Sequence, residues 1–185
     1  GYRQDSSINR NASIENYTEA IKVITAAGGW VVRLGDPTMS HVPKTERVID
    51  YPHTRFKSEL MDIYLISQCR LLIGTNSGPS DVALLFKKPT TLVNTCDWAT
   101  SLPLRKGDLT ILKHVYSRPL NRFLSIQEIL EETYTSLGFK ALPKKYVMVQ
   151  NTSEEIRDVI EESLNQPDDY IYSDLQIAFN KGRNQ

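Results

Sequence analysis

The residues from Leu71 to Phe86 constrain the fold of this 185-residue chain more than any other segment. An apolar run ends abruptly in the polar turn Gly74-Thr75-Asn76-Ser77-Gly78-Pro79, and a second apolar run with helical spacing follows. Ser77 suits the N-cap of a helix, and Pro79 suits its first turn, where a missing N–H costs nothing. The segment therefore predicts a buried strand, a tight turn and the start of a helix.

This turn has the properties of an anion-binding site. Its backbone N–H groups and the positive end of the helix dipole would point at one spot, which favours a phosphate or diphosphate. It lacks the Gly-Lys-Ser/Thr of a Walker A loop, and it does not match the GxGxxG loop of NAD-binding proteins. We expect donor-diphosphate contacts from Thr75, Asn76, Ser77 and Gly78. The alternative is an ordinary strand-to-helix turn with a capped helix.

Strands and helices are expected to alternate along the rest of the chain. The strands are predicted at 30–34, 47–51, 70–73, 90–94 and 109–112, with a short candidate at 147–149. Helices are predicted at 13–27, from Ser58 to 66, at 79–86, at 125–137 and from 152 or 153 to 164. This alternation predicts an α/β fold with a Rossmann-like, mainly parallel sheet flanked by helices. We expect one such domain over 1–150, and a carboxy-terminal helix and polar tail over 151–185.

Finer predictions concern the helices. Ser13 is expected to cap the first helix, and Ser125 and Glu128 to form a capping box on a later one. The helix that follows Ser58 is apolar on nearly all sides, which predicts that it is buried. Asp62 in that helix is expected to be exposed or paired with a cation.

Polar side chains follow the carboxyl end of every predicted strand, where open α/β sheets bind ligands. Arg33 interrupts an apolar strand, and a buried arginine needs an anionic partner. That partner is Asp36 or Asp50, or the phosphate of a bound ligand. Trp98 either stacks on a base or sugar or covers the edge of the core. The residues expected on this rim are Arg33, Asp36, Asp50, Tyr51, Thr75, Asn76, Ser77, Gly78, Asn94, Thr95, Asp97, Trp98, His114 and Tyr116.

Composition excludes several classes of function. Lys plus Arg and Asp plus Glu both number 22, so no overall field draws the chain to nucleic acid or to an anionic membrane. No apolar stretch is long enough for a transmembrane segment. Cys69 and Cys96 are far apart, and the three histidines are scattered, so no zinc pattern is present and no metal site is expected. Two reduced cysteines in a cytoplasmic protein are the expected state.

An ordered set of motifs resembles a known family. The motifs are Arg10-Asn11, Gly28 to Gly35, Ile49-Asp50-Tyr51, Met61 to Leu65, Ile73 to Pro79, Lys88-Pro89 and Asn94. Over about residues 1–135 they resemble glycosyltransferases from microbial polysaccharide gene clusters. The turn is also similar to the donor-phosphate loop of heptosyltransferases and, more distantly, of fucosyltransferases of the GT-B type.

The resemblance implies the donor-binding, carboxy-terminal half of a GT-B enzyme. Such an enzyme binds a nucleotide-sugar as substrate, uses no cofactor or metal, and transfers the sugar to a glycan acceptor. Thr75, Ser77 and Gly78 would contact the diphosphate, with Asn76, Asn94, Asp97 and Trp98 completing the donor site. Arg33 would stabilise the leaving group, and Asp5 or Asp50 is the candidate base. Family members have a strand before the residues matching Gly1–Asp5 and an amino-terminal acceptor domain, and we expect the residues from Gly1 onward to include neither.

Two other functions remain open on the same fold. One is a nucleotide-sugar epimerase or hydrolase, and the other is a non-catalytic module that binds a nucleotide or another protein. The expected location is the cytoplasm, either free or peripheral to the inner membrane.

Overall fold

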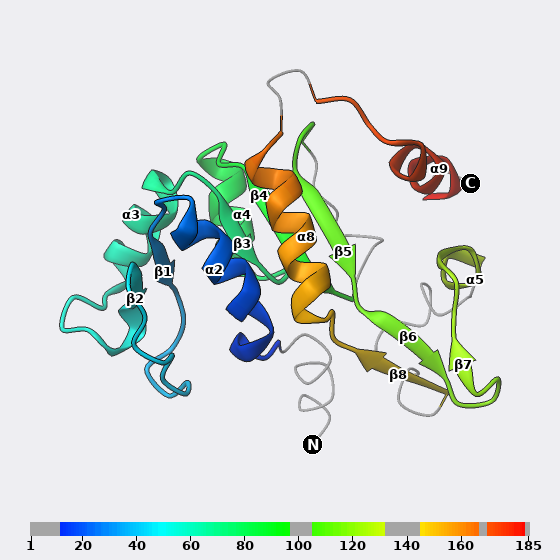
Figure 1. Ribbon diagram of the computed structural model, residues 1–185, viewed down its shortest axis with the longest axis horizontal. Helices are drawn as coiled ribbons and strands as arrows, with labels where there is room; N and C mark the ends of the chain where they lie inside the picture. The colour runs from blue at the N-terminus through cyan, green and yellow to red at the C-terminus, as the bar shows by residue number, and fades with distance from the viewer. Residues whose placement is uncertain (1–11, 97–104, 132–144, 167–169, 184–185) are drawn as a thin grey trace.

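Parallel strands and the helices that flank them form the centre of the molecule (Figure 1). The computed structural model describes residues 12–96, 105–131, 145–166 and 170–183. Strands β1 (Val31–Arg33) and β2 (Val48–Asp50) form one parallel pair. Strands β3 (Leu72–Gly74), β4 (Thr90–Thr95) and β5 (Leu109–Leu112) form a second parallel sheet in that order. The predicted α/β class with parallel sheets is therefore confirmed.

Four helices pack around these sheets. Helix α2 (Thr18–Ala26) continues from the 3₁₀ turn η1 (Ile14–Tyr17) and packs against α8 (Ser153–Leu164), and both lie in front of the strands in Figure 1. Helix α3 (Glu59–Gln68) packs against α4 (Gly78–Leu85), which also contacts β3 and β4. Each predicted crossover helix is present, within a few residues of its expected bounds.

The main core joins the sheet to α8. All six residues of β4 are buried, and Val93 packs in one cluster with Leu109, Ile156 and Ile160. Because β-branched side chains suit a strand covered on both faces, the sequence of β4 fits this position. Helix α8 lies beyond residue 150, yet it contributes fully buried side chains to the same core.

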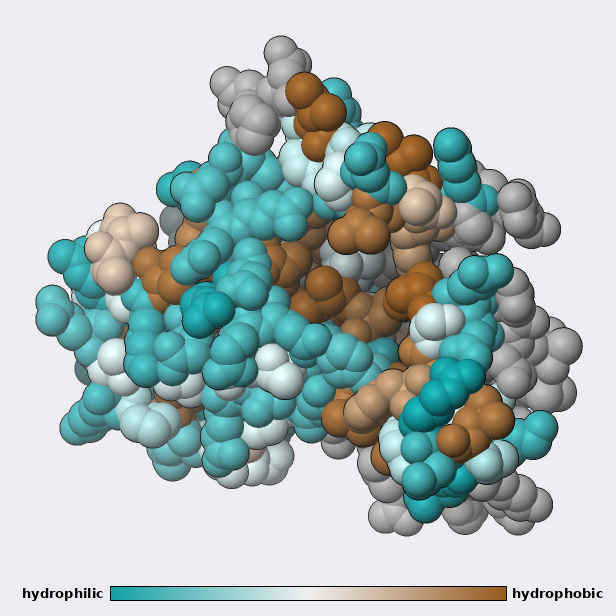
Figure 2. Space-filling model, turned by 45° about the vertical axis from the view of Figure 1, so that its right-hand side comes forward, coloured by the Kyte–Doolittle hydropathy of each residue, from teal (hydrophilic) through white to brown (hydrophobic). Residues whose placement is uncertain are grey.

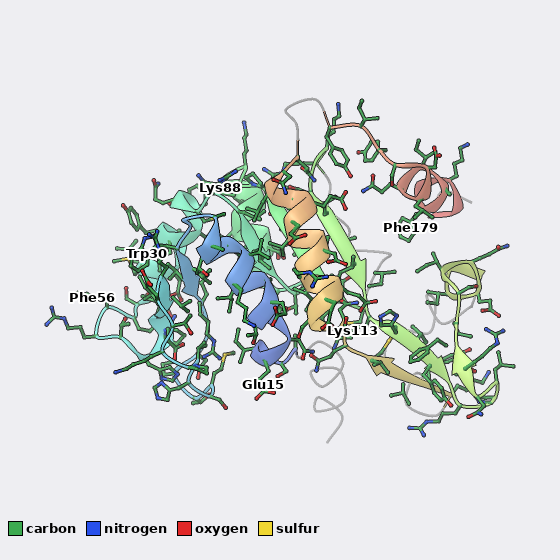
Figure 3. The ribbon with its side chains drawn as sticks, in the orientation of Figure 1. Glu15, Trp30, Phe56, Lys88, Lys113 and Phe179 are labelled. Atoms are coloured by element: carbon green, nitrogen blue, oxygen red, sulfur yellow. The ribbon has the colours of Figure 1, made fainter. Side chains whose placement is uncertain are left out.

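No backbone pairing joins β1 to β3 among the described residues. Both strands are only half-buried, although central strands of a parallel sheet are normally covered on both faces. Trp30, which precedes β1, is 64% exposed. It lies on the β1 side of the molecule in Figure 3. Within the described residues, β1 and β3 are therefore edge strands of two separate parallel sheets.

A third, antiparallel sheet follows β5, and the sequence analysis did not expect it. Strand β6 (His114–Ser117) lies between β7 (Arg122–Phe123) and β8 (Tyr146–Val149), and α5 (Ile126–Glu131) packs on it. Lys113 marks the junction with β5 (Figure 3), and its N–H donates to the Thr95 carbonyl at 2.8 Å. His114 and Tyr116 thus belong to a strand and not to the rim loop that we expected. Figure 2 brings this side forward and shows apolar surface exposed there.

Two local predictions were wrong. The first helix begins with the 3₁₀ turn η1, and the Ser13 side chain makes no capping bond to it, while the Ser13 amide donates to Gln150 Oε1 at 2.8 Å. Helix α3 is not buried: Leu60 is 78% exposed and only Ile66 is buried, because α4 covers one side of it alone. Helix α9 (Asp174–Arg183), for which no prediction was made, lies within the expected polar tail.

Other local predictions were confirmed. The Glu128 carboxylate accepts the Ser125 amide at 2.8 Å, and the Ser125 hydroxyl accepts the Glu128 amide at 3.2 Å, which forms the predicted capping box. Asp62 pairs with Lys57. The part of helix 125–137 beyond residue 131 lies outside the described residues. Cys69 and Cys96 form no disulfide.

Candidate functional site

The carboxyl ends of β1 and β2 place Arg33 beside Asp50. The two residues are paired in the register of the strands, and Arg33 Nη1 lies 3.0 Å from Asp50 Oδ1. The same nitrogen donates to the Ser40 carbonyl at 2.5 Å. Of the two carboxylates that the sequence offered as partners, the ion pair therefore forms with Asp50. Asp36 instead accepts the Thr38 amide at 2.8 Å.

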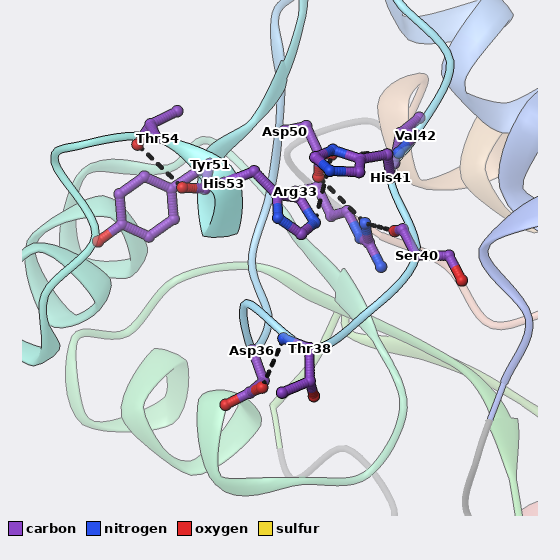
Figure 4. A network of polar contacts seen from close by, with 10 residues as sticks. All are labelled: Arg33, Asp36, Thr38, Ser40, His41, Val42, Asp50, Tyr51, His53 and Thr54. Atoms are coloured by element: carbon purple, nitrogen blue, oxygen red, sulfur yellow. Dashed lines mark hydrogen bonds and ion pairs between the residues drawn. The ribbon is translucent and has the colours of Figure 1, made fainter.

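Asp50 is the centre of this polar network (Figure 4). Its side chain is only 18% exposed, and its Oδ2 accepts the Val42 amide at 3.1 Å. Burial by itself would raise the pKa of Asp50, but the Val42 amide and the Arg33 guanidinium outweigh burial and lower the pKa. Asp50 is therefore a carboxylate at neutral pH, and a weak base.

Two histidines complete the network. His41 Nδ1 lies 3.3 Å from Asp50 Oδ2, and His53 Nε2 lies 3.7 Å from the same oxygen. The two imidazole rings face each other with their centroids 3.7 Å apart. His53 is largely buried, whereas His41 is 76% exposed on the loop between β1 and β2. Figure 4 shows both rings beside the Asp50 side chain.

A short 3₁₀ turn fixes the position of His53. This turn, η2 (Tyr51–His53), begins directly after β2 and includes Pro52, whose ring suits the first turn of a helix. The buried Tyr51 hydroxyl accepts the Ser58 amide at 2.9 Å and donates to the Ser58 carbonyl at 3.1 Å. The same Ser58 caps α3, because its hydroxyl accepts the Met61 amide. The loop that carries His53 is thus held at both ends.

The β3–α4 turn lies at the carboxyl end of the next sheet, with Ser77 at the N-cap of α4 as expected. The Ser80 hydroxyl accepts the Ser77 amide at 3.3 Å, and the Ser77 hydroxyl donates to the Thr75 carbonyl at 3.2 Å. The Ser80 amide also donates to the Ser77 carbonyl, and Pro79 has no N–H. The Ser77 and Ser80 amides, which were expected to be available to an anion, therefore already donate within the turn. Of the first three residues of α4, Gly78 keeps an amide for which no acceptor is found among the described residues.

Both glycines of this turn border open space. A Cβ atom added at Gly74 or at Gly78 would meet no heavy atom of the described residues within 4 Å, and neither residue has a positive φ. Glycine is therefore not required here by backbone conformation. It leaves room beside the amino-terminal end of α4, which is the volume that an anionic ligand would need.

Asn94 occupies a buried position in β4 and not an open rim. Its N–H donates to Asn151 Oδ1 at 2.6 Å, and its own Oδ1 accepts the Asn151 N–H at 2.7 Å. This reciprocal pair ties β4 to the segment before α8. The other residues predicted for the donor site or for catalysis, Asp5, Asp97 and Trp98, lie outside the described residues.

The sequence analysis missed His41 and His53 as members of the site. They stand 12 residues apart, with no helical or strand-like spacing to each other, so only the loop and the 3₁₀ turn bring them together. The single local signal was that both flank Asp50, itself expected on the rim.

Comparisons with protein families, with curated proteins and with solved structures found no match to this chain. Among the helices of the described ranges, none combines the length and the apolar character that crossing a bilayer requires.

Proposed function

We propose that this chain is the donor-binding half of a GT-B glycosyltransferase, which transfers a sugar from a nucleotide-sugar to a glycan acceptor. The observation that carries the proposal is the open space over Gly74 and Gly78 at the amino-terminal end of α4. It lies at the carboxyl end of a parallel strand, where α/β proteins bind nucleotides. The arrowheads of β1 and β5 point to the same lower edge in Figure 1, so Arg33 belongs to this edge as well.

The diphosphate would lie against the β3–α4 turn, with the Gly78 amide and the Thr75 hydroxyl as donors. The Ser77 hydroxyl would exchange its bond to the Thr75 carbonyl for one to the phosphate. Arg33 uses Nη1 for both of its protein partners, so Nη2 and Nε are left for a phosphate oxygen. Donors held in place in this way stabilise charge that develops on the departing nucleoside diphosphate. Asp50 is a weak base in this environment, and we assign it the positioning of Arg33.

The acceptor would come from the amino-terminal acceptor domain that the resemblance implies, and that domain would also supply a base in place of Asp50, which is assigned to positioning Arg33. One further parallel strand from that direction would also pair with the open edges of β1 and β3. We therefore expect this chain to bind the donor and to need the other half for transfer. Transfer would use no metal and no cofactor.

Calorimetric titration with UDP, GDP, ADP and CDP, and with their sugar conjugates, tests the donor site. We expect one nucleotide class to bind. Gly78→Leu should weaken it at least tenfold and Gly78→Ala less, because the added side chain fills the ligand volume without a clash in the protein. One charge-assisted hydrogen bond contributes about 1.5–3 kcal/mol, and about 1.4 kcal/mol corresponds to tenfold in affinity.

Gln68→Leu is the matched control. It adds the same side chain to an exposed, uncharged position at the last residue of α3, away from the carboxyl end of β3. Its affinity should equal that of the unmodified chain. The proposal fails if no nucleotide binds, or if Gly78→Leu binds as tightly as the control.

A further inference from the structure

Three potential metal-ligand atoms converge beyond the ends of β1 and β2. They are His41 Nδ1, Asp50 Oδ2 and His53 Nε2, and all lie within 4.8 Å of one another. They come from a loop, a strand end and a 3₁₀ turn. Figure 4 shows the two rings and the carboxylate turned toward one another.

The contacts among these atoms are not hydrogen bonds. His53 Nε2 is buried and makes no hydrogen bond to any residue that the structure describes, and its 3.7 Å separation from Asp50 Oδ2 is too long for one. The 3.3 Å between His41 Nδ1 and the same oxygen exceeds the ~2.7–2.9 Å of a charge-assisted bond. A buried ring nitrogen without a hydrogen-bond partner is unfavourable, so a ligand bound to His53 Nε2 would stabilise this arrangement.

The separations fit the edges of a coordination tetrahedron. Zinc binds imidazole nitrogen and carboxylate oxygen at about 2.0–2.2 Å, which sets ligand atoms ~3.3–3.5 Å apart around the ion. Two edges of the cluster, 3.3 and 3.7 Å, are close to this range. The third, between the two imidazoles, is at most 4.8 Å. His41 is exposed on a loop, so its ring can close that edge by rotating.

We propose that His41, Asp50 and His53 bind a divalent transition-metal cation of the Zn²⁺ type, with a fourth coordination position open to solvent. Two imidazoles and one carboxylate form a ligand set for zinc and not for magnesium or calcium, which prefer oxygen ligands throughout. Three protein ligands with an open position are typical of catalytic zinc, whereas structural zinc has four.

Neighbouring groups already hold the carboxylate in place. Asp50 Oδ1 accepts from Arg33 at 3.0 Å, and Oδ2 accepts the Val42 amide at 3.1 Å, which leaves a lone pair of Oδ2 for the cation. Partners of this kind orient metal ligands. Arg33 points at Oδ1 and at the Ser40 carbonyl, so it lies on the side of Asp50 away from the proposed ion. The ion and Arg33 together carry more positive charge than Asp50 neutralises, so the open position favours an anion or hydroxide.

Titration of the whole chain with ZnCl₂ in metal-free buffer, without nucleotide, tests the site. We expect one equivalent to bind, and His41→Ala and His53→Ala each to lower the affinity at least tenfold. His41 is so exposed that its replacement should leave folding intact, which circular dichroism verifies. His114→Ala is the matched control. It removes a histidine on β6, in another sheet, that pairs with Glu155, and zinc affinity should not change.

Cobalt provides an independent readout of geometry. Co²⁺ in a tetrahedral site absorbs visible light far more strongly than aqueous Co²⁺, and we expect that absorption in the unmodified chain and its loss in His53→Ala. The proposal is overturned if zinc does not bind at one equivalent, or if both histidine variants bind it like the control. Because no nucleotide is present, this outcome leaves the proposed donor site untouched.

Discussion

Replacing Asn151 by Ala should destabilise the protein far more than its small change in size suggests. Asn151 is buried, and its side chain bridges two strands of the parallel sheet. Its Oδ1 accepts the Asn94 amide at 2.6 Å, and its Nδ2 donates to the Leu112 carbonyl at 2.7 Å. Alanine removes both bonds while leaving the backbone bond from Asn151 to Asn94 Oδ1 in place.

The size of the destabilisation follows from the two polar groups that lose their partner in Asn151→Ala. The Asn94 amide stays buried without an acceptor, which costs about 1–3 kcal/mol. The Leu112 carbonyl is half-buried and regains some contact with water, so its lost bond adds only about 1 kcal/mol. The free energy of unfolding should therefore fall by about 2–4 kcal/mol.

Urea unfolding followed by circular dichroism measures this loss, with an unchanged m-value as evidence that the variant unfolds as the parent does. Asn165→Ala is the control, because its amide makes one exposed bond to the Glu161 carbonyl, and it should cost less than about 0.5 kcal/mol. A loss below about 1 kcal/mol for Asn151→Ala would show that the bridge does not couple β4 and β5 to the segment before α8.

Three further outcomes are expected. Ile156→Ala should lower the free energy of unfolding by about 2–5 kcal/mol, and Ile156→Val by about 0.5–1.5 kcal/mol in the same urea assay, since the fully buried side chain packs between sheet and helix. The bonds from Arg122 and, next, from the Ser125 amide lower the pKa of Glu128 from 4.5 to about 2. These contacts stabilise the fold above pH 4.5, and their contribution disappears as the pH falls toward 2, so Glu128→Gln should flatten that part of a stability-against-pH curve. Amides of β4 should exchange with deuterium more slowly than those of β1 and β3, because β4 alone of the three strands is buried and paired on both sides. Equal exchange rates would contradict the assignment of β1 and β3 as edge strands.

The strand and helix positions could be predicted because their signals are local. Ser58 and Thr152 both cap helices through a side chain that reaches an amide three residues on, and no distant contact is involved. The apolar run before Gly74 and the β-branched run of β4 likewise carry their own evidence.

The failures came from features that depend on distant partners. The apolar residues of α3 predicted burial, but burial needs a neighbouring surface, and α4 covers only one side of that helix. The antiparallel sheet pairs β6 with β8, whose residues are about 30 positions later in the chain, and such short strands lack a strong pattern of their own. Asn94 looked like a rim residue until its partner at position 151 was known.

The amino-acid sequence alone determined the α/β alternation, the β3–α4 turn and the presence of Arg33 at a strand end, because backbone preference and apolar periodicity act over a few neighbouring residues. Tertiary structure alone decided that Arg33 pairs with Asp50 and that His41 and His53 approach the same carboxylate oxygen. The reason is geometric: parallel pairing of β1 with β2 sets the ends of two separate segments side by side, and no spacing within either segment encodes that meeting.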